Sequence, residues 1–162
     1  MAASILERRN LRYYDWGDVL SDIEELKANG YDHAERGNLS LGQICNHLAI
    51  VMEAAVDGFP YRVLWPLTTI MRWILLNSML RLEPTRLRLP APPFASQKKP
   101  VSDEEGAARL RAAIVRFGDP QVTCAKHFAF GRLTRNEWTH QQLWHCEHHL
   151  RFLIPKSAER TV

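Results

Sequence analysis

Hydrophobic residues recur at intervals of three and four along several stretches of the chain, which is the period of an α-helix with one buried face. The first stretch lies between Asp15, which can cap a helix, and about Asn29, with Gly30 just beyond its end. Its apolar positions are Trp16, Val19, Leu20, Ile23 and Leu26. This pattern predicts an amphipathic helix.

A second predicted helix runs from Leu41 to about Val56. Ser40 and Gln43 have the spacing of a capping box at its start, and a glycine follows its end. Its apolar stripe consists of Leu41, Ile44, Leu48, Val51, Met52 and Ala55. His47 lies beside this stripe, so the helix can present an imidazole close to its buried face.

Two later stretches have the same features. Residues 102–117 form a predicted helix that Ser102 and Glu105 open as a capping box. The last and longest stretch is Thr134–Pro155, in which Glu137 is the capping partner of Thr134. No residue interrupts this stretch before the proline, so we expect one helix to continue to about that point.

The most apolar segment of the chain is 65–82. Arg72 lies near its middle, and its uninterrupted apolar length falls short of the roughly 20 residues that cross a bilayer. We expect a buried or partner-facing helix here and no membrane span. The following residues, 83–100, contain five prolines and predict a long connection without regular helix.

No strand pattern competes with these helices, so the predicted class is all-α. Four main helices suit an antiparallel bundle, with an extra helix in the long connection between the second and third of them. A length of 162 residues fits one domain over residues 1–162.

Composition narrows the function classes. The net charge is +3, and the 21 basic residues are scattered among 18 acidic ones, so we expect no nucleic-acid partner. Three cysteines without CxxC spacing argue against a disulfide framework. The first residues have no apolar leader, so we expect a reducing, cytoplasmic location.

Histidines carry the most specific chemical signal. His145 and His149 are four residues apart on the last predicted helix, so they share one face and can offer two imidazoles to a divalent metal. His47 is the proposed third ligand. Three protein ligands leave a position open for water or substrate, as in catalytic zinc sites. The pair His145 and His148 is also geometrically allowed, and it remains open which of the two pairs binds.

Several other candidates receive simpler interpretations. His127 precedes an aromatic–glycine turn, where it can line a pocket mouth or, more simply, bond a backbone carbonyl. Glu53 and Glu147 are interpreted as solvated surface carboxylates. Cys45 and Cys146 are interpreted as small buried hydrophobic residues without reactivity.

Three segments resemble the DinB/YfiT-like superfamily, and more closely its branch called domain of unknown function 1569. They are LSLGQICNHLA at 39–49, RLRAAIVRFGD at 109–119 and FGRLTRNEWTHQQLWHCEHHLRFL at 130–153. The resemblance extends from about residue 8 to about residue 154. Phe128 is a departure, because relatives tend to have proline after the loop histidine.

The resemblance implies an often dimeric four-helix bundle with up-down-down-up connectivity. It also implies a divalent metal held by one histidine of the second helix and an HxxxH pair of the last, which are His47, His145 and His149 here. Characterised members of the wider superfamily include transferases and isomerases that act with low-molecular-weight thiols. A small-molecule substrate and a thiol cofactor are therefore expected.

Two function hypotheses follow. The first is a metal-dependent enzyme, a thiol transferase or a hydrolase, with zinc or nickel as the leading metals. The alternative is a non-enzymatic dimeric interaction protein of the same fold, in which the histidines are vestigial and residues 65–82 supply the contact surface.

Overall fold

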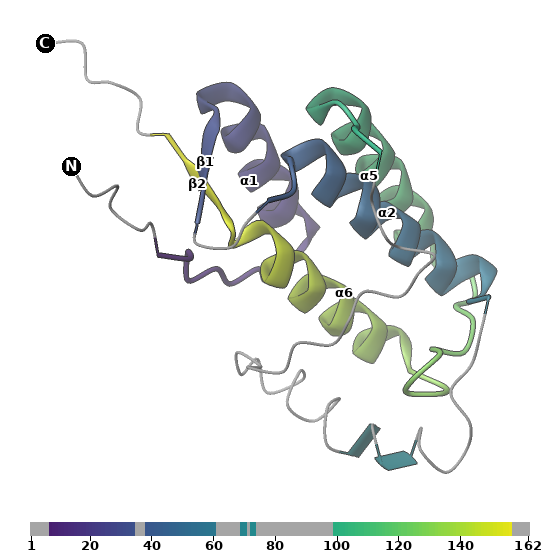
Figure 1. Ribbon diagram of the computed structural model, residues 1–162. Coiled ribbons are helices and arrows are strands. Elements are labelled where there is room, and N and C mark those ends of the chain that lie inside the picture. The colour runs from purple at the N-terminus through teal and green to yellow at the C-terminus, as the bar shows by residue number, and fades with distance from the viewer. Residues whose placement is uncertain (1–6, 35–37, 61–68, 71, 74–98, 157–162) are drawn as a thin grey trace, which may run out of the picture.

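Four long helices and a two-stranded sheet form the described part of a computed structural model, which covers residues 7–34, 38–60, 69–70, 72–73 and 99–156 (Figure 1). In chain order the elements are α1 (Trp16–Asn29), β1 (Tyr31–His33), α2 (Leu41–Asp57), α5 (Asp103–Gly118), α6 (Arg135–Leu150) and β2 (Leu153–Pro155). The chain is therefore mainly helical. The extra helix predicted within 65–82 falls largely outside the described residues.

Local capping explains where the helices begin. The Ser40 and Thr134 capping boxes are confirmed, each with both of its hydrogen bonds. Ser102 caps α5, because its hydroxyl oxygen accepts from the Glu105 backbone N–H. This is one of the two hydrogen bonds of the predicted capping box. Asp15 forms a further box at α1. Each helix start is thus fixed by side chains within one turn.

The end of the chain differs from the prediction, because α6 ends at Leu150 and does not continue to Pro155. Residues 153–155 instead pair antiparallel with β1, Leu153 opposite His33 and Pro155 opposite Tyr31. Leu153 is completely buried, so the turn out of the helix places an apolar side chain in the core. The proline cannot donate a helical hydrogen bond and favours an extended residue before it. The chain is mainly helical, as expected, and the small two-stranded sheet is a feature that the sequence pattern did not predict.

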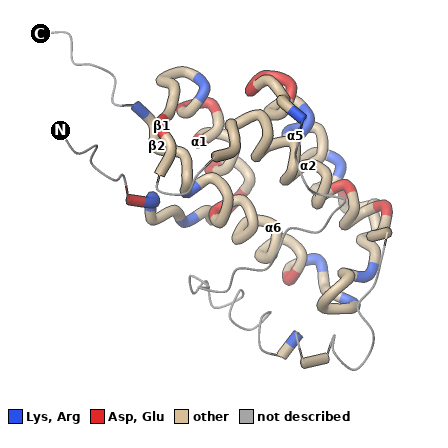
Figure 2. The backbone as a smooth tube through the Cα atoms, in the orientation of Figure 1, with Lys and Arg blue, Asp and Glu red and all other residues tan. Residues whose placement is uncertain are grey.

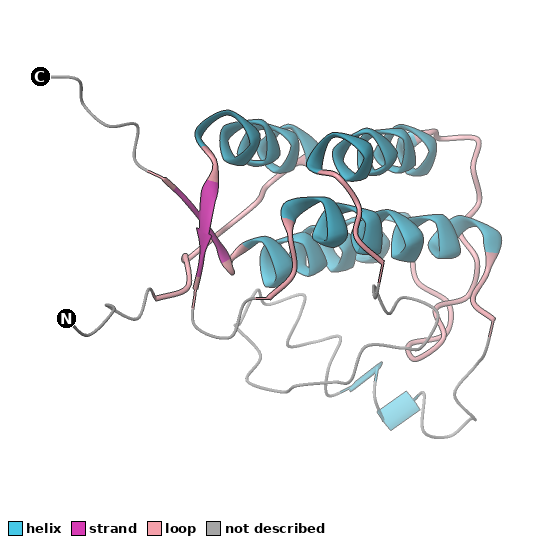
Figure 3. Ribbon diagram, turned by 45° about the horizontal axis from the view of Figure 1, so that its top comes forward, coloured by secondary structure: helices cyan, strands magenta, loops and turns pink. Residues whose placement is uncertain are grey.

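The helices lie in two layers, α1 and α5 in one and α2 and α6 in the other (Figure 3). The closest approach is between α2 and α5 at Gly42 and Gly106. A Cβ atom added at Gly106 would lie only 2.7 Å from the Gly42 Cα, and one added at Gly42 would overlap the backbone of Ser102. Absence of side chains at both positions lets the two helix backbones touch.

The residues before α1 attach that helix to the end of α6. The Arg9 backbone N–H donates to the Arg151 carbonyl (3.0 Å). The Arg9 guanidinium binds both carboxylate oxygens of Asp22 on α1, at 2.5 and 2.9 Å, and the Leu150 carbonyl at 3.1 Å. One arginine therefore links three segments that are distant in sequence.

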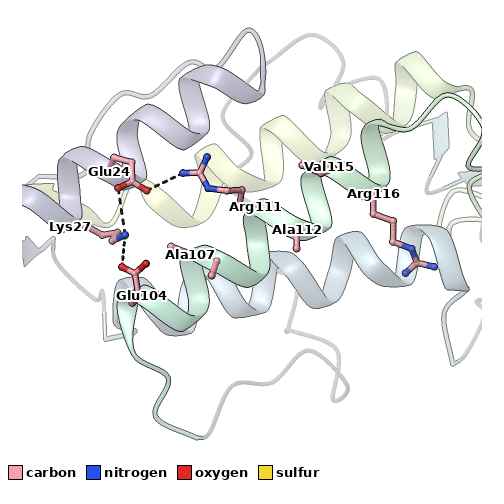
Figure 4. Close-up of a pocket in the computed structure, with 9 residues that line it drawn as sticks. Glu24, Lys27, Glu104, Ala107, Arg111, Ala112, Val115 and Arg116 are labelled. Carbon is pink, nitrogen blue, oxygen red and sulfur yellow. Dashed lines mark hydrogen bonds and ion pairs between the residues drawn. The ribbon is translucent and has the colours of Figure 1, made fainter.

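Basic and acidic residues are scattered over the molecule, and α2 and α6 contain long uncharged runs (Figure 2). A groove lies between α1 and α5, and four of its charged side chains bind one another (Figure 4). Lys27 pairs with Glu104 (2.6 Å) and Glu24 (3.5 Å), and Arg111 pairs with Glu24 (3.1 Å). These ion pairs connect α1 to α5 at one part of the groove, and Ala107, Ala108, Ala112 and Val115 form an apolar part of its lining.

Arg72, the central charge of the apolar segment, bonds to the residues around the start of α6. Its guanidinium donates to the Arg132 carbonyl (2.6 Å) and to Glu137 (2.8 Å). Within the described ranges, no helix combines the length and apolarity that a membrane crossing requires.

Candidate metal centre

Three histidines from two helices converge at one point. His47 comes from α2 and is 4% exposed, and His145 and His149 come from successive turns of α6. The Nε2 atom of His145 lies 3.3 Å from Nε2 of His47 and 3.0 Å from Nε2 of His149. The possible ligand atoms of all three lie within 4.8 Å of one another. The structure thus brings together the three residues that the sequence selects.

This spacing suits a metal ion. Metal–imidazole bonds of about 2.0–2.1 Å in a tetrahedral site place two ligand nitrogens roughly 3.3 Å apart, and right-angled ligands place them about 2.9 Å apart. The observed separations of 3.0 and 3.3 Å fall in this interval. The group could therefore hold one metal ion.

Hydrogen bonding alone does not account for the geometry. An imidazole nitrogen has either one proton or one in-plane lone pair, so His145 Nε2 can form one good hydrogen bond and not two. It nevertheless has two Nε2 neighbours within 3.3 Å. A cation that accepts all three lone pairs resolves this conflict.

The protonation state also favours a metal. Burial lowers the pKa of His145 and of His149 well below the usual value, and the neighbouring histidines of the cluster lower both further. Both rings are therefore neutral at pH 7 and keep a lone pair for a ligand bond. His145 Nδ1 is buried and has no hydrogen-bond partner among the described residues. In most metal sites this second ring nitrogen of a histidine donates a hydrogen bond, so His145 differs from the usual ligand in this respect.

His148 does not join this cluster. Its ring stacks on Trp144, with centroids 5.4 Å apart, and meets Phe152 edge-on. Of the two pairs that the sequence left open, the structure brings His145 and His149 together with His47, and it places His148 outside the cluster.

His127 is buried, and its ring contacts Phe59, Phe128, Phe130 and Trp138. Its Nδ1 accepts from the backbone N–H groups of Ala129 and Phe130, both at 3.1 Å, and its ring stacks on Phe130. The predicted bond to a backbone carbonyl was wrong, because the turn from His127 to Gly131 points its own amides at the ring. Burial lowers the pKa of His127 to about 3, so the ring is neutral with its proton on Nε2.

The two glutamates have different environments. Glu53 forms a bidentate pair with Arg109, at 3.0 and 2.7 Å. Glu147 was expected to be solvated, but it is buried and accepts from the Tyr13 backbone N–H at 2.7 Å. Burial raises the pKa of its carboxyl group. Each carboxylate is thus committed to a structural contact.

The cysteines are free, and Cys45 and Cys146 are buried as predicted. Burial raises the pKa of Cys45 to about 12 and raises that of Cys146 as well. The pKa of the half-buried Cys124 is raised for the same reason. All three are therefore protonated thiols at neutral pH.

Sequence reasoning did not identify Gln142 as a residue of this region. Gln142 lies three residues before His145 and seven before His149, on the same face of α6, and Trp138 lies one turn earlier. Both are completely buried, and the Trp138 Nε1 and both amide atoms of Gln142 have no hydrogen-bond partner among the described residues. The signal in the sequence was a glutamine at a position of the last helix that shares its face with the histidine pair.

Comparison with known proteins gives one positive result. No curated protein and no solved structure has a significant match. A family model described as "Protein of unknown function (DUF1569)" matches residues 5–156. This match covers nearly the whole chain and includes all three clustered histidines, so the chain belongs to the DUF1569 family of unknown function.

Proposed function

We propose that the protein binds one divalent metal ion, zinc or nickel, through Nε2 of His47, His145 and His149, and uses it to act on a small-molecule substrate. The observation that carries this proposal is the convergence of three histidine side chains, with Nε2 of His145 at 3.3 Å from that of His47 and at 3.0 Å from that of His149. Neutral rings at pH 7 support it further.

When bound, the metal would lower the pKa of a coordinated water or thiol and so generate a nucleophile near neutral pH. The protein's part is to hold the three imidazoles together where α2 meets α6 and to leave a coordination site open. This arrangement favours a thiol transferase or a hydrolase.

The cysteines favour an external thiol over a protein nucleophile. Burial raises the pKa of all three of them, so none supplies a thiolate at neutral pH. A low-molecular-weight thiol as the second substrate is consistent with the resemblance to the DinB/YfiT-like superfamily. We also propose that the helices have the up-down-down-up connectivity of that superfamily. The protein would form a homodimer and be located in the cytoplasm.

The second candidate function is a dimeric interaction protein with vestigial histidines. Ile70 and Trp73 favour it, because these apolar side chains of the 65–82 segment are 53% and 74% exposed. Size-exclusion mass with and without a chelator separates the candidates. A dimer that has no metal and does not respond to chelator supports the interaction protein.

Metal content of untagged protein tests the main proposal. Elemental analysis should find about one zinc or nickel ion per wild-type chain, and His47→Ala and His149→Ala should each lose it while circular dichroism retains the helical signal. His148→Ala is the matched control, because this neighbouring histidine stacks on Trp144 outside the cluster. Wild-type protein that stays metal-free after reconstitution would refute the site.

A further inference from the structure

Three arginines near the end of α6 have charges that the fold does not use. Arg8 and Arg12 belong to the segment before α1, and Arg151 directly follows the last residue of α6. Among the described residues none of their guanidiniums forms a hydrogen bond or an ion pair, and Nε of Arg151 is buried without a partner. Arg9 differs from them, because it binds the Asp22 carboxylate. The other three guanidiniums are therefore available to a ligand.

A row of rings connects two of these arginines to the candidate metal centre. The Cζ atom of Arg8 lies 4.9 Å from the centroid of the Phe152 ring, over its face. The Phe152 ring meets that of His148 edge-on, with centroids 6.3 Å apart, and the His148 ring meets that of His149 at 5.1 Å. Burial lowers the pKa of His148, and the positive charges of Arg151 and Arg8 lower it further. Both arginines thus lie close to the end of α6 that holds His149.

This region is open to solvent, so a ligand has room there. Arg8 is exposed, and Arg151, His148 and His149 are partly exposed. The segment before α1 runs past the C-terminal end of α6 (Figure 1), where the Arg9 backbone N–H donates to the Arg151 carbonyl at 3.0 Å. A ligand can therefore approach along the surface between this segment and α6 without entering the core.

Positive charge predominates in this region. The metal-binding group consists of histidines alone, so neutral ligands would leave a divalent ion with its full charge. Residues 7–13 contribute three arginines and one glutamate. Glu147 lies near Arg12 and Arg151, but one of its oxygens already accepts from the Tyr13 backbone N–H at 2.7 Å. Such a surplus of positive charge attracts an anion.

We propose that Arg8 and Arg151 bind the acidic group, a carboxylate or a phosphate, of a small substrate whose other end reaches the metal of the three-histidine centre. A guanidinium recognises either oxyanion through paired N–H donors. The rings of His148 and Phe152 lie between the two ends and pack against the middle of the substrate. This assignment rests on the proposed metal centre and specifies the charge of its substrate.

The test compares metal-binding probes on cobalt-loaded protein. Suberic acid monohydroxamate has a hydroxamate for the metal at one end and a carboxylate at the other, and its terminal primary amide has the same shape without the charge. The change in cobalt absorption gives each Kd by titration in low salt. Wild-type protein should bind the carboxylate roughly tenfold more tightly, the gain expected from charge-assisted hydrogen bonds. The preference should shrink in high salt, because the arginines are accessible to solvent.

Arg8→Gln and Arg151→Gln should each reduce the preference, and the double variant should abolish it, while cobalt uptake and the circular dichroism spectrum stay unchanged. Arg132→Gln is the matched control, because it removes the same charge from an exposed arginine just before α6, at the opposite end of that helix. It should keep the preference. A phosphonate probe of the same length distinguishes the two acids, since the natural acidic group is the one whose preference depends more strongly on Arg8 and Arg151.

Cobalt uptake distinguishes failure of the acid-binding arginines from failure of the metal centre. Wild-type protein that takes up no cobalt overturns both. Normal cobalt uptake with equal affinity for the acidic probes and the amide overturns the role of the arginines alone, and so does a preference that survives in the double variant.

Discussion

Acidification is expected to destabilise the metal-free protein, and His127 accounts for a defined share of the loss. Its ring is buried and accepts two backbone N–H bonds at Nδ1, so the folded state cannot protonate that nitrogen without breaking both. The pKa is about 3 in the folded protein, against about 6.5 in the unfolded chain. The unfolded state therefore binds more protons between these values.

The sign and size follow from this difference. A lowered folded-state pKa leaves stability complete above about pH 6.5 and removes it progressively as the pH falls toward 3. Between about pH 7.5 and pH 5 the linkage relation gives a loss of about 2 kcal/mol in the free energy of unfolding from His127 alone. His145 and His149 add losses of the same sign, because their pKa values are also lowered. Glu147, whose pKa is raised, acts in the opposite direction.

Urea unfolding of chelator-treated protein across this pH range measures the total, and His127→Asn isolates the histidine. Asparagine can still accept from the Ala129 and Phe130 amides, as in turns that asparagine commonly forms. Loss of the ring costs stability at every pH, so the comparison is the slope with pH. The variant should lose about 2 kcal/mol less than wild type between pH 7.5 and 5. Parallel curves would refute the assignment of His127 as a buried neutral acceptor.

Two further predictions concern the framework around the site. Gly106→Ala should lower the free energy of unfolding by about 1–3 kcal/mol or more in urea titration, because its Cβ would overlap the Gly42 backbone, whereas Gly118→Ala in the same helix meets nothing and should be neutral or slightly stabilising. Equal effects of the two would contradict the close contact of α2 with α5. Glu147→Gln should raise the free energy of unfolding near pH 8, since burial raises the pKa of that carboxyl and glutamine can still accept from the Tyr13 N–H. The gain should disappear near pH 4, where the glutamate is protonated. A destabilised variant at pH 8 would contradict this account.

Helix starts could be predicted from sequence because their determinants are local. Ser40 and Thr134 each form two hydrogen bonds with the residue three positions later, so both partners lie within a segment of four residues. The spacing of His145 and His149 is local in the same sense, and so is their shared face.

Contacts between distant residues could not be predicted in this way. The pairing of Tyr31 with Pro155 joins strands of three residues each, which is too short for an alternating pattern to be visible. Burial of Glu147 depends on the Tyr13 N–H, 134 positions away. Neither partner carries a local signal, so the early end of α6 and the burial of Glu147 could not be predicted from the residues around them.

The face of α6 that carries the candidate site combines both situations. Its histidines have a spacing that suggests a ligand pair, but Trp138 and Gln142 have the same helical phase and would pass for core positions of an amphipathic helix. Only their burial without hydrogen-bond partners distinguishes them from ordinary packing. A polar buried face weakens a fold, so the stability of this one must come from elsewhere, in particular from the close contact of α2 with α5 and the Arg9 links between α1 and α6. Because those contacts do not involve the histidines, the helices should persist when the site is emptied, and the loss of a ligand should then be read as a loss of binding and not of structure.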